Sequence, residues 1–586
     1  MKSFSKTFYK LYYSYLLKKQ PFKTPASWDN NRVDYEYHTD YKNLFLTAPK
    51  AKKLENYKNT NIIYQVLIYN FADGNNDGIG DFIGLKDKIE YISNLGVDQI
   101  WLSPIHPASS YHGYSVIDYC NVDSRLGGMN AFIDFLNIAH EHGIKVYLDM
   151  VFNHTSYEHP WFQAALANDG YSDFYRLDIN LYDSDVKVDN LEIKSKYPFT
   201  TDINATNRTY LARFSYGMPD LNLDNYKVIE QLIHIQKFWT AVGVDGFRYD
   251  AFAEYYSSEI ETKNNFNEAK IFHLLRDASK QITDAENREE VFMMGEWVNS
   301  DAVKGLMYLK DADGNIGLDT IYDGGKFFRH NPDVRIEYNQ LKNMLIEYQN
   351  TSQKAKWIPF LDNHDVRRWL EVYRSQISKK KWYKFNDNLT TSEKEALNIA
   401  LFVLLALPAT PIIYAADELY YYSTRYYGDP TLREPMKWEN NTYNCFIYDP
   451  KVKESFGDHI MFTSALNLES ADVQSKQGQA YKLIQFMAKL RKDYPFLSLT
   501  DADTIANPYD FVDTVDYSSV IIRKDLGQQK EYLLFAFCNY QHKKLDLLKI
   551  SRNYHFEQIL LYKAKNESWR IWIEQGGYVI FKLIRK

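Results

Sequence analysis

The chain has 586 residues, which is more than one ordinary domain and predicts either several domains or one large barrel with additions. Hydrophobic residues make up 45% and charged residues 25% of the chain, so disorder throughout its length is excluded. The net charge of −7 provides no cationic excess to displace counterions from phosphates. This argues against a nucleic-acid-binding protein and favours a neutral substrate.

The cysteines and the N-terminus indicate in which cellular compartment the protein is expected. Three thiols without a CxxC pair (Cys120, Cys445 and Cys538) cannot form a disulfide framework and are compatible with a reducing compartment. We therefore expect a cytoplasmic protein, with secretion or surface exposure as the alternative. The short stretch Leu11 to Leu17 lies between lysines without a small-residue cleavage site, which favours a surface helix or loose extension over a signal peptide. No apolar run reaches the roughly 20 residues that cross a bilayer.

Strand-like and helix-like segments alternate between about Asn61 and Tyr414, which predicts a parallel (β/α)8 TIM barrel with helices outside. The predicted strands are Ile62–Phe71, Gln99–Ser103, Lys145–Val151, Gly246–Tyr249, Val291–Gly295, Leu318–Tyr322, Trp357–Leu361 and Pro411–Tyr414. The predicted helices are Gly84–Leu95, Asn130–His142, Asn225–Val242, Phe266–Ile282, Ile336–Tyr348 and Ser392–Leu405.

Two stretches depart from this alternation. Residues 153–221 are rich in Asn, Asp and Tyr and have little helical periodicity, which predicts a loop-rich subdomain inserted after strand 3. Alternating runs after about Phe496, such as Tyr532–Phe537, predict a C-terminal antiparallel β-sandwich domain. The predicted domains are an N-terminal extension (1–54), the barrel (55–152 and 222–495), the inserted subdomain (153–221) and the C-terminal domain (496–586).

Acidic side chains directly follow several predicted strands. Because the chemistry of a β/α barrel is built where strands end, we expect these side chains to line one pocket. Glycosidic bond cleavage needs such a set, since one carboxyl group must donate a proton while another attacks or stabilises the anomeric carbon. Arg248, on the same strand face as Asp250, would keep that carboxylate ionised. The acids at strand ends are Asp149, Asp250, Glu296 and Asp365.

Several short motifs occur in a fixed order along the barrel. They are LDMVFNH with Asp149 and His154, GFRYDA with Arg248 and Asp250, GEW with Glu296, and FLDNHD with His364 and Asp365. Gly113-Tyr114, Met218-Pro-Asp220-Leu-Asn222 and Thr410-Pro-Ile-Ile-Tyr414 add to the pattern. From about Tyr64 to Trp438 the sequence resembles the α-amylase family of glycoside hydrolases, family 13, and it is similar to an intermediate group of that family that includes amylases.

This resemblance implies a role for each matching residue. Asp250 is implied as the nucleophile, Glu296 as the general acid/base, and Asp365 as a third carboxylate that binds sugar hydroxyls and stabilises the transition state. Asp149 and Asn153 would anchor the loop of His154, either through a metal ion or through a hydrogen bond to Arg248. The residues implied in substrate binding are Tyr114, which would stack on the sugar ring, together with His154, Arg248 and His364.

The loop after the first strand predicts a cation site. Oxygen-bearing residues alternate around a glycine turn, as in the first nine positions of an EF-hand, but Gly84 stands where the acid of the twelfth position is expected. Similar loops bind calcium in many members of the α-amylase family, and a Gly/Asn/Asp turn without an ion is the alternative. The predicted ligands of a structural Ca²⁺ are Asp73, Asn75, Asp77, Ile79 through its carbonyl, and Asp81.

Departures from the family pattern bear on the substrate. Ser115 stands where exo-acting α-glucosidases of the family carry Asp, which favours an endo-acting cleft, and Ala253 and Glu254 replace a Lys-His pair that contacts leaving-side sugars. We therefore expect a retaining endo-acting α-amylase that hydrolyses α-1,4-glucosidic bonds in starch-like glucans or maltooligosaccharides. An oligo-α-1,6-glucosidase or an α-glucan transglucosylase is the alternative. A non-catalytic sugar-binding relative is disfavoured because all three carboxylates are present.

Overall fold

The computed structural model describes most of the chain, and the stretch Leu11 to Leu17 lies outside the described residues. Among the described helices, none is both long and apolar enough to cross a membrane. The described residues are 36–177, 199–201, 208–255, 269–297, 305–311, 313–322, 328, 331–351, 356–379, 388–423, 429–439, 443–445, 468–512, 517–527, 531–539, 543–567 and 570–586.

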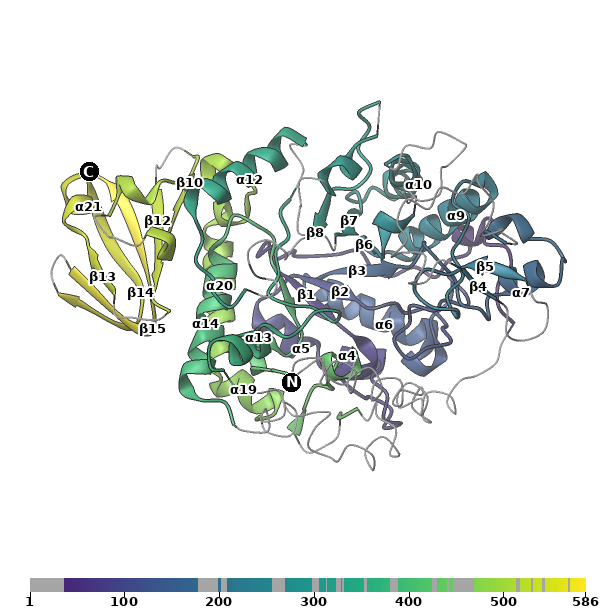
Figure 1. Ribbon diagram of the computed structural model, residues 1–586, viewed down its shortest axis with the longest axis horizontal. Helices are drawn as coiled ribbons and strands as arrows, with labels where there is room; N and C mark the ends of the chain where they lie inside the picture. The colour runs from purple at the N-terminus through teal and green to yellow at the C-terminus, as the bar shows by residue number, and fades with distance from the viewer. Residues whose placement is uncertain are drawn as a thin grey trace, which may run out of the picture.

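A curled parallel sheet forms the centre of the molecule (Figure 1). Its strand order is β8-β7-β6-β3-β2-β1-β9. Parallel bridges Tyr322↔Ile358 and Phe360↔Ile412 join its two edges through the segment predicted as the seventh strand, so the sheet closes into the predicted barrel. The strands are β1 (Ile63–Val66), β2 (Gln99–Leu102), β3 (Lys145–Met150), β6 (Gly246–Tyr249), β7 (Phe292–Glu296), β8 (Thr320–Tyr322) and β9 (Ile412–Tyr414).

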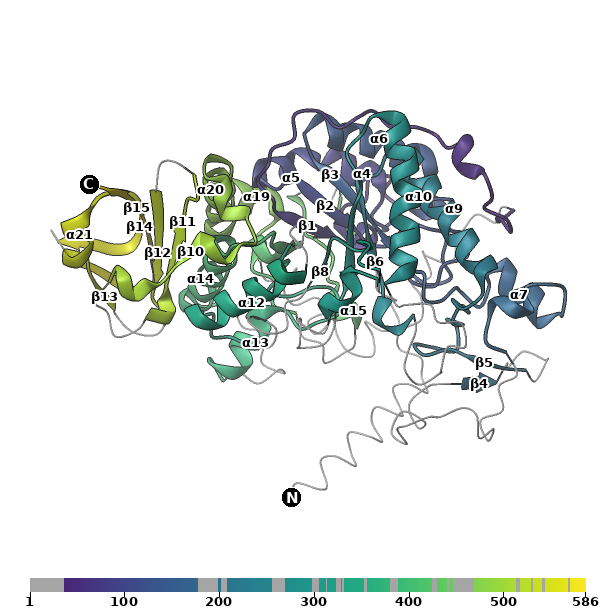
Figure 2. The same cartoon turned by 90° about the horizontal axis from the view of Figure 1, so that it is seen from above.

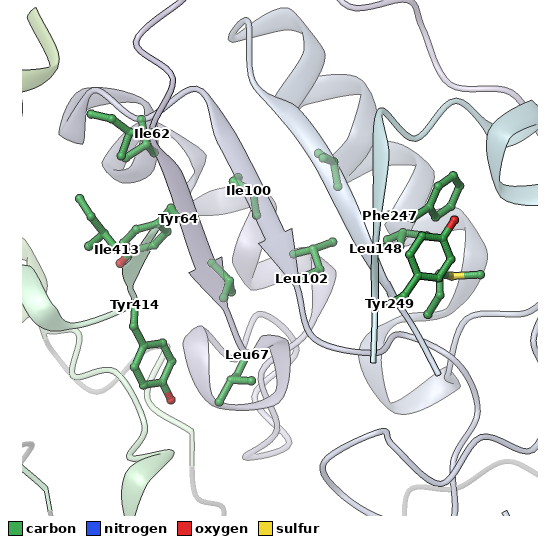
Figure 3. Close-up of a cluster of buried hydrophobic side chains, with 14 of the residues drawn as sticks. Ile62, Tyr64, Leu67, Ile100, Leu102, Leu148, Phe247, Tyr249, Ile413 and Tyr414 are labelled. Carbon is green, nitrogen blue, oxygen red and sulfur yellow. The ribbon is translucent and has the colours of Figure 1, made fainter. Parts of the chain in front are cut away.

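Side chains on the two faces of this sheet belong to two separate apolar clusters. Residues such as Tyr64, Ile100 and Phe247 belong to the large apolar core (Figure 3). Alternate residues such as Ile63 and Trp101 form a separate, smaller cluster with residues of the other strands. Because side chains alternate along a strand, Asp149 and Arg248 occupy the same alternate positions in β3 and β6, where they are direct register partners.

Helices cover the outside of the barrel (Figures 1 and 2). Each of the two longest ends at a residue with positive φ, Gly243 after α9 and Asn287 after α10, the usual way to stop a helix. The helices of the barrel region are α3 (Ile68–Phe71), α4 (Phe82–Asp87), α5 (Ile89–Leu95), α6 (Gly128–Glu141), α9 (Tyr226–Val242), α10 (Lys270–Glu286), α12 (Tyr338–Thr351), α13 (Trp369–Gln376), α14 (Thr391–Ala406), α15 (Asp429–Leu432), α19 (Ala471–Gln477) and α20 (Gln479–Asp493).

Two predicted elements were wrong in detail, and the described part of the inserted stretch contains short elements of its own. The run Ile62–Phe71 is not one strand, because β1 ends at Val66 and the chain turns into the short helix α3; every residue of the run is buried, so no exposed position marks the turn. The predicted helix Gly84–Leu95 is two helices, α4 and α5, separated at Lys88. The stretch 153–221 contains the helix α7 (Pro160–Leu166) and a two-stranded sheet of β4 (Phe199–Thr201) and β5 (Thr209–Leu211).

The C-terminal region forms an antiparallel β domain, as predicted, and its described strands make one sheet. One face packs on the barrel through α14, where Phe402 contacts Phe535 and Tyr578, and the other face has its own apolar core. Helix α14 lies between this sheet and the barrel (Figures 1 and 2), and it is buried along most of its length. The strands are β10 (Ile505–Ala506), β11 (Val520–Lys524), β12 (Glu531–Phe537), β13 (Lys543–Asp546), β14 (Tyr554–Glu567) and β15 (Arg570–Arg585).

A buried arginine joins this sheet to the barrel. Arg523 of β11 is fully buried and donates to the carbonyls of Ala406, the last residue of α14, and of Phe496 and Leu497. It also donates to Thr504 at both the carbonyl and the hydroxyl. Burial lowers the pKa of Arg523, so these acceptors must offset the cost of desolvating the guanidinium.

Replacing Arg523 should loosen this junction. The variant Arg523→Met leaves several buried carbonyls without a donor, and at about 1–3 kcal/mol for each unsatisfied group we expect a lower melting temperature and a large loss of unfolding free energy. Thermal and urea unfolding measure both quantities. Arg552→Met, at an exposed position of the same domain, is the matched control and should unfold like the wild type. Equal stability of the two variants would contradict a junction role for Arg523.

Candidate active site

The guanidinium of Arg248 lies at the centre of the candidate active site. It is fully buried, and its Nη1 donates to Asp149 Oδ1 and Asp250 Oδ1, both at 2.7 Å. Its Nη2 lies 3.0 Å from Glu296 Oε1 and donates to the Tyr322 hydroxyl at 2.7 Å. One cation thus binds the carboxyl groups at the ends of β3, β6 and β7.

Three carboxyl groups around one guanidinium cannot all be balanced by it. Burial raises the pKa of Asp149 to about 8 and that of Glu296 to about 7, against the opposing charge of Arg248. Burial also raises the pKa of Asp250, which Arg248 opposes through charge and a hydrogen bond. The cluster therefore favours keeping at least one proton near neutral pH while the rest stays ionised. That combination suits acid and nucleophilic catalysis in one site.

The backbone after β6 also binds Glu296. The Ala251 N–H donates to Glu296 Oε2 at 2.9 Å, and Ala251 has a φ of 47°, in the left-handed region that non-glycine residues rarely occupy. Gly295 permits the close approach, since a Cβ at this position would lie 2.6 Å from the Phe252 ring. The turn after Asp250 and the end of β7 are thus fitted to each other, which fixes Glu296 relative to Asp250.

Tyr114 and His364 form one side of the site. Their rings stack in parallel with centroids 5.5 Å apart, and the Tyr114 hydroxyl lies 2.7 Å from His364 Nε2. The same hydroxyl donates to Asp149 Oδ2 at 3.1 Å, and Gln65 Nε2 lies 2.7 Å from His364 Nδ1. Burial lowers the pKa of His364 to about 3, so this imidazole is neutral at neutral pH and offers a hydrogen bond rather than a charge.

His154 lies next to this pair. Its Nε2 is 3.1 Å from the Tyr114 carbonyl, and its ring packs against Phe214 with centroids 5.2 Å apart. Burial lowers the pKa of His154 to about 4, so it too is neutral. Asp149 is expected to anchor the loop of His154 either through a metal ion or through a hydrogen bond to Arg248. The hydrogen bond to Arg248 is present. Asn153 Nδ2 lies 3.4 Å from His154 Nδ1.

Asp365 has a different set of partners from the other acids. Its Oδ2 lies 3.0 Å from His364 Nε2, and its Oδ1 lies 3.0 Å from Arg433 Nη2. Its side chain is 41% exposed, against 12% for Asp250 and for Glu296. Burial acts to raise the pKa of Asp365, but its interactions with His364, Arg433 and Arg248 outweigh it and lower the pKa to about 2. Asp365 is therefore an ionised, accessible acceptor.

The structure brings together all seven residues predicted for catalysis and substrate binding, and it adds partners that sequence reasoning missed. Gln65 could have been found, because it is a polar residue inside an apolar run. The other partners carry no local signal, since each lies in a segment whose neighbours give no hint of the site. They are Tyr322, which accepts from Arg248, Trp101, which donates to Asp149, and Arg433.

The cavities lined by described residues include two at the other end of the barrel, of about 540 and 890 Å³. Lys145 lines both of them and is the first residue of β3, and Phe292, the first residue of β7, lines the larger. The acids described above lie at the carboxyl ends of the strands. We therefore place the chemistry at the carboxyl ends, where β/α barrels have their active sites, and not in these cavities.

The loop 73–81 is folded by its own hydrogen bonds. Asp73 accepts from the backbone N–H groups of residues 76, 77 and 78, and Asp77 accepts from that of Ile79. Asp81 caps α4 through Oδ1, while its buried Oδ2 has no hydrogen-bond partner among the described residues. Burial, together with the charges of Asp73 and Asp77, raises the pKa of Asp81 to about 6. Among the described residues, no group of three or more His, Cys, Asp or Glu side chains is arranged to hold a metal ion.

Comparison with known proteins agrees with this site. The family model for the α-amylase catalytic domain matches residues 65–500, more than half of the chain. Alpha-amylase 3 of Dictyoglomus thermophilum is 32% identical over 442 residues, which cover 74% of this chain and 78% of that protein. A 4-alpha-glucanotransferase of Thermotoga neapolitana is 29% identical over 360 residues, which cover 61% of this chain and 71% of that protein.

A solved structure shares the fold over nearly the whole chain. Amy13B of Eubacterium rectale superimposes with a TM-score of 0.70 at 21% identity, covering 94% of this chain and 99% of its own. The fold, the site at the strand ends and the family match therefore lead to one conclusion. The chain belongs to the α-amylase family, and it is an enzyme of the O-glycosyl hydrolase type.

Proposed function

We propose that the protein is a retaining endo-acting α-amylase that hydrolyses α-1,4-glucosidic bonds in starch-like glucans or maltooligosaccharides. The observation that carries this proposal is the binding of Asp250 and Glu296 to neighbouring nitrogens of the one Arg248 guanidinium. This shared cation keeps the two carboxyl groups close. Retaining enzymes need a separation of about 5 Å, whereas inverting enzymes need room for a water molecule between the two groups.

In the first step, Asp250 attacks the anomeric carbon while the bond from this carbon to the leaving oxygen breaks. Arg248 holds Asp250 Oδ1, so Oδ2 is the attacking atom. Glu296, with its pKa raised to about 7, donates its proton to the leaving oxygen. In the second step Glu296 takes a proton from water, the water oxygen bonds to the anomeric carbon, and the bond to Asp250 breaks.

The remaining residues are assigned to binding the sugar at the cleaved bond. Asp365, ionised and exposed, accepts hydrogen bonds from sugar hydroxyls, and His154 and His364 offer neutral imidazoles beside it. Tyr114 presents a ring next to both histidines. This arrangement suits a neutral, hydroxyl-rich ligand, because most of the charge in the site is compensated within it.

Ser115 supports internal over terminal cleavage. It is buried and accepts a hydrogen bond from the Ser110 hydroxyl at 2.9 Å, so no carboxylate stands there to hold the end of a glucan chain. Transglucosylation is the second candidate, because one relative is named a 4-alpha-glucanotransferase. Both reactions use the same covalent intermediate and differ in whether water or a sugar hydroxyl accepts the glucosyl group.

Product analysis separates these outcomes. With starch and maltoheptaose we expect a ladder of mid-length maltooligosaccharides, because an endo-acting enzyme binds the chain on both sides of the cleaved bond. Chromatography of early time points measures this distribution. Glucose as the sole first product would contradict endo cleavage, and products longer than maltoheptaose would favour transfer over hydrolysis.

A substrate that needs no proton separates the two catalytic roles. We expect Glu296→Gln to lose about 10²- to 10⁴-fold in kcat/KM on maltoheptaose but much less in kcat/KM on α-maltosyl fluoride, because kcat/KM reports the first step and fluoride leaves in that step without protonation. Asp250→Asn should lose several orders of magnitude on both substrates, since the attacking carboxylate is gone. Fluoride release and reducing-sugar assays measure the two rates. Equal losses of both variants on both substrates would refute the assignment.

We propose further that the loop 73–81 binds a structural Ca²⁺. The support is the donor set of carboxylate, amide and carbonyl oxygens and the buried, unpartnered Asp81 Oδ2, which a hard cation would satisfy. The ligands would be Asp73, Asn75, Asp77, Ile79 through its carbonyl, and Asp81. The raised pKa of Asp81, caused by burial and by the charges of Asp73 and Asp77, fits a site that lacks a positive charge.

Calcium should then stabilise the fold. A cation present at 100 times its Kd adds about 2.7 kcal/mol to the unfolding free energy, so chelation should lower the melting temperature measured by scanning calorimetry. The variant Asp81→Asn keeps an N-cap side chain on α4 but should lose this calcium dependence. Asp134→Asn, at an exposed helix position, is the control and should retain it. Identical melting curves with calcium and with chelator would indicate an empty turn.

A further inference from the structure

The third carboxylate is held by a cation of its own. Arg248 pairs with Asp149, Asp250 and Glu296, whereas Asp365 pairs with Arg433. The Arg433 side chain is 6% exposed, and its Nε donates to the His364 carbonyl at 3.2 Å. One guanidinium therefore fixes both the backbone before Asp365 and one of its two carboxylate oxygens. The orientation of Asp365 depends on where Arg433 stands.

Arg433 belongs to a segment that lies against α3. The Met436 N–H donates to the Asn70 carbonyl at 2.9 Å, and Trp438 Nε1 donates to the Phe71 carbonyl at 2.6 Å. The Phe71 and Trp438 rings also pack edge to face. Helix α3 follows β1 directly, so the barrel itself presents these groups at the carboxyl end of its first strand.

Asn70 is the residue of α3 that acts at Arg433 itself. Its side chain is buried, and its Nδ2 donates to the Arg433 carbonyl at 2.8 Å and to the Glu434 carbonyl at 3.3 Å. Elsewhere the segment is held by Tyr414, which donates to the Leu432 carbonyl, and by Tyr421, which donates to the Pro435 carbonyl. Loss of the Asn70 amide would therefore leave the segment attached and free the backbone at the arginine.

We propose that Asn70 is a positioning residue for catalysis, which fixes the backbone at Arg433 and thereby holds the Arg433 guanidinium against Asp365. Asn70 binds the backbone of Arg433, and Arg433 in turn binds Asp365, so Asn70 would act on the sugar through these two residues. The proposal rests on the proposed function in one respect, that Asp365 binds the sugar during glucan cleavage. It predicts that Asn70 affects turnover only through Arg433.

A double-mutant cycle tests this dependence. We expect Asn70→Ala to lower kcat/KM on maltoheptaose by about 10- to 100-fold, the effect of a misplacement of about 1 Å in an active site. Arg433→Ala should lower it at least as much. The double variant should be no worse than Arg433→Ala alone, because Asn70 has nothing left to position. Asn70→Ser, which retains a donor, should recover part of the loss and serves if Asn70→Ala does not fold.

Asn398→Ala is the matched control, since Asn398 is a fully buried asparagine on α14. It should lower the melting temperature about as much as Asn70→Ala yet keep wild-type kcat/KM. Normal activity of Asn70→Ala, an equal loss in Asn398→Ala, or losses that multiply in the double variant would each overturn the inference. A wild-type protein that cleaves no glucan would instead overturn the proposed function, and with it the role of Asp365 on which this inference rests.

Discussion

The buried guanidinium of Arg248 contacts the carboxyl groups at the ends of three strands, and the candidate active site depends on these contacts. Each acid alone would be an uncompensated charge in a buried position, and the arginine alone would be an uncompensated cation. Together the arginine and the acids compensate each other's charge and hold each other in place. Because the carboxyl groups outnumber the cation, the cluster keeps a proton near neutral pH, which a pair of carboxylates in water would not do.

The acidic residues of the site are positioned by the barrel in two different ways. A continuous ladder of parallel strands, in which β3 pairs with β6 and β6 pairs with β7, fixes the positions of four site residues. They are Asp149, Arg248, Asp250 and Glu296. Asp365 follows a segment that joins the sheet by the isolated bridges of Ile358 and Phe360 and not by a named strand. Its position therefore depends less on the ladder and more on side-chain contacts. Arg433 and His364, which hold its two oxygens, supply these contacts.

The C-terminal sheet is part of the support of the barrel. It covers α14, which would otherwise expose an apolar face, and Arg523 reaches from β11 to the end of that helix. Arg491 of α20 makes a similar contact with the same helix end, since it is fully buried and donates to the carbonyls of Thr60 and Leu405. Both arginines thus satisfy carbonyls at the end of α14, and Arg491 also satisfies one just before β1.

The sequence by itself determined the barrel, the C-terminal β domain and the residues that meet at the strand ends. Strands and helices have different apolar periods, and alternation along β6 puts Arg248 and Asp250 on one face. The run from Ile62 to Phe71 is mostly apolar, and its two polar residues, Gln65 and Asn70, follow neither a strand period nor a helix period, so the end of β1 could not be found. Only the tertiary structure decided that Tyr322 binds Arg248 and that Arg433, 68 residues from Asp365 in sequence, binds that acid. Such partners are selected by the packing of distant segments, and the residues next to them in sequence carry no trace of the contact.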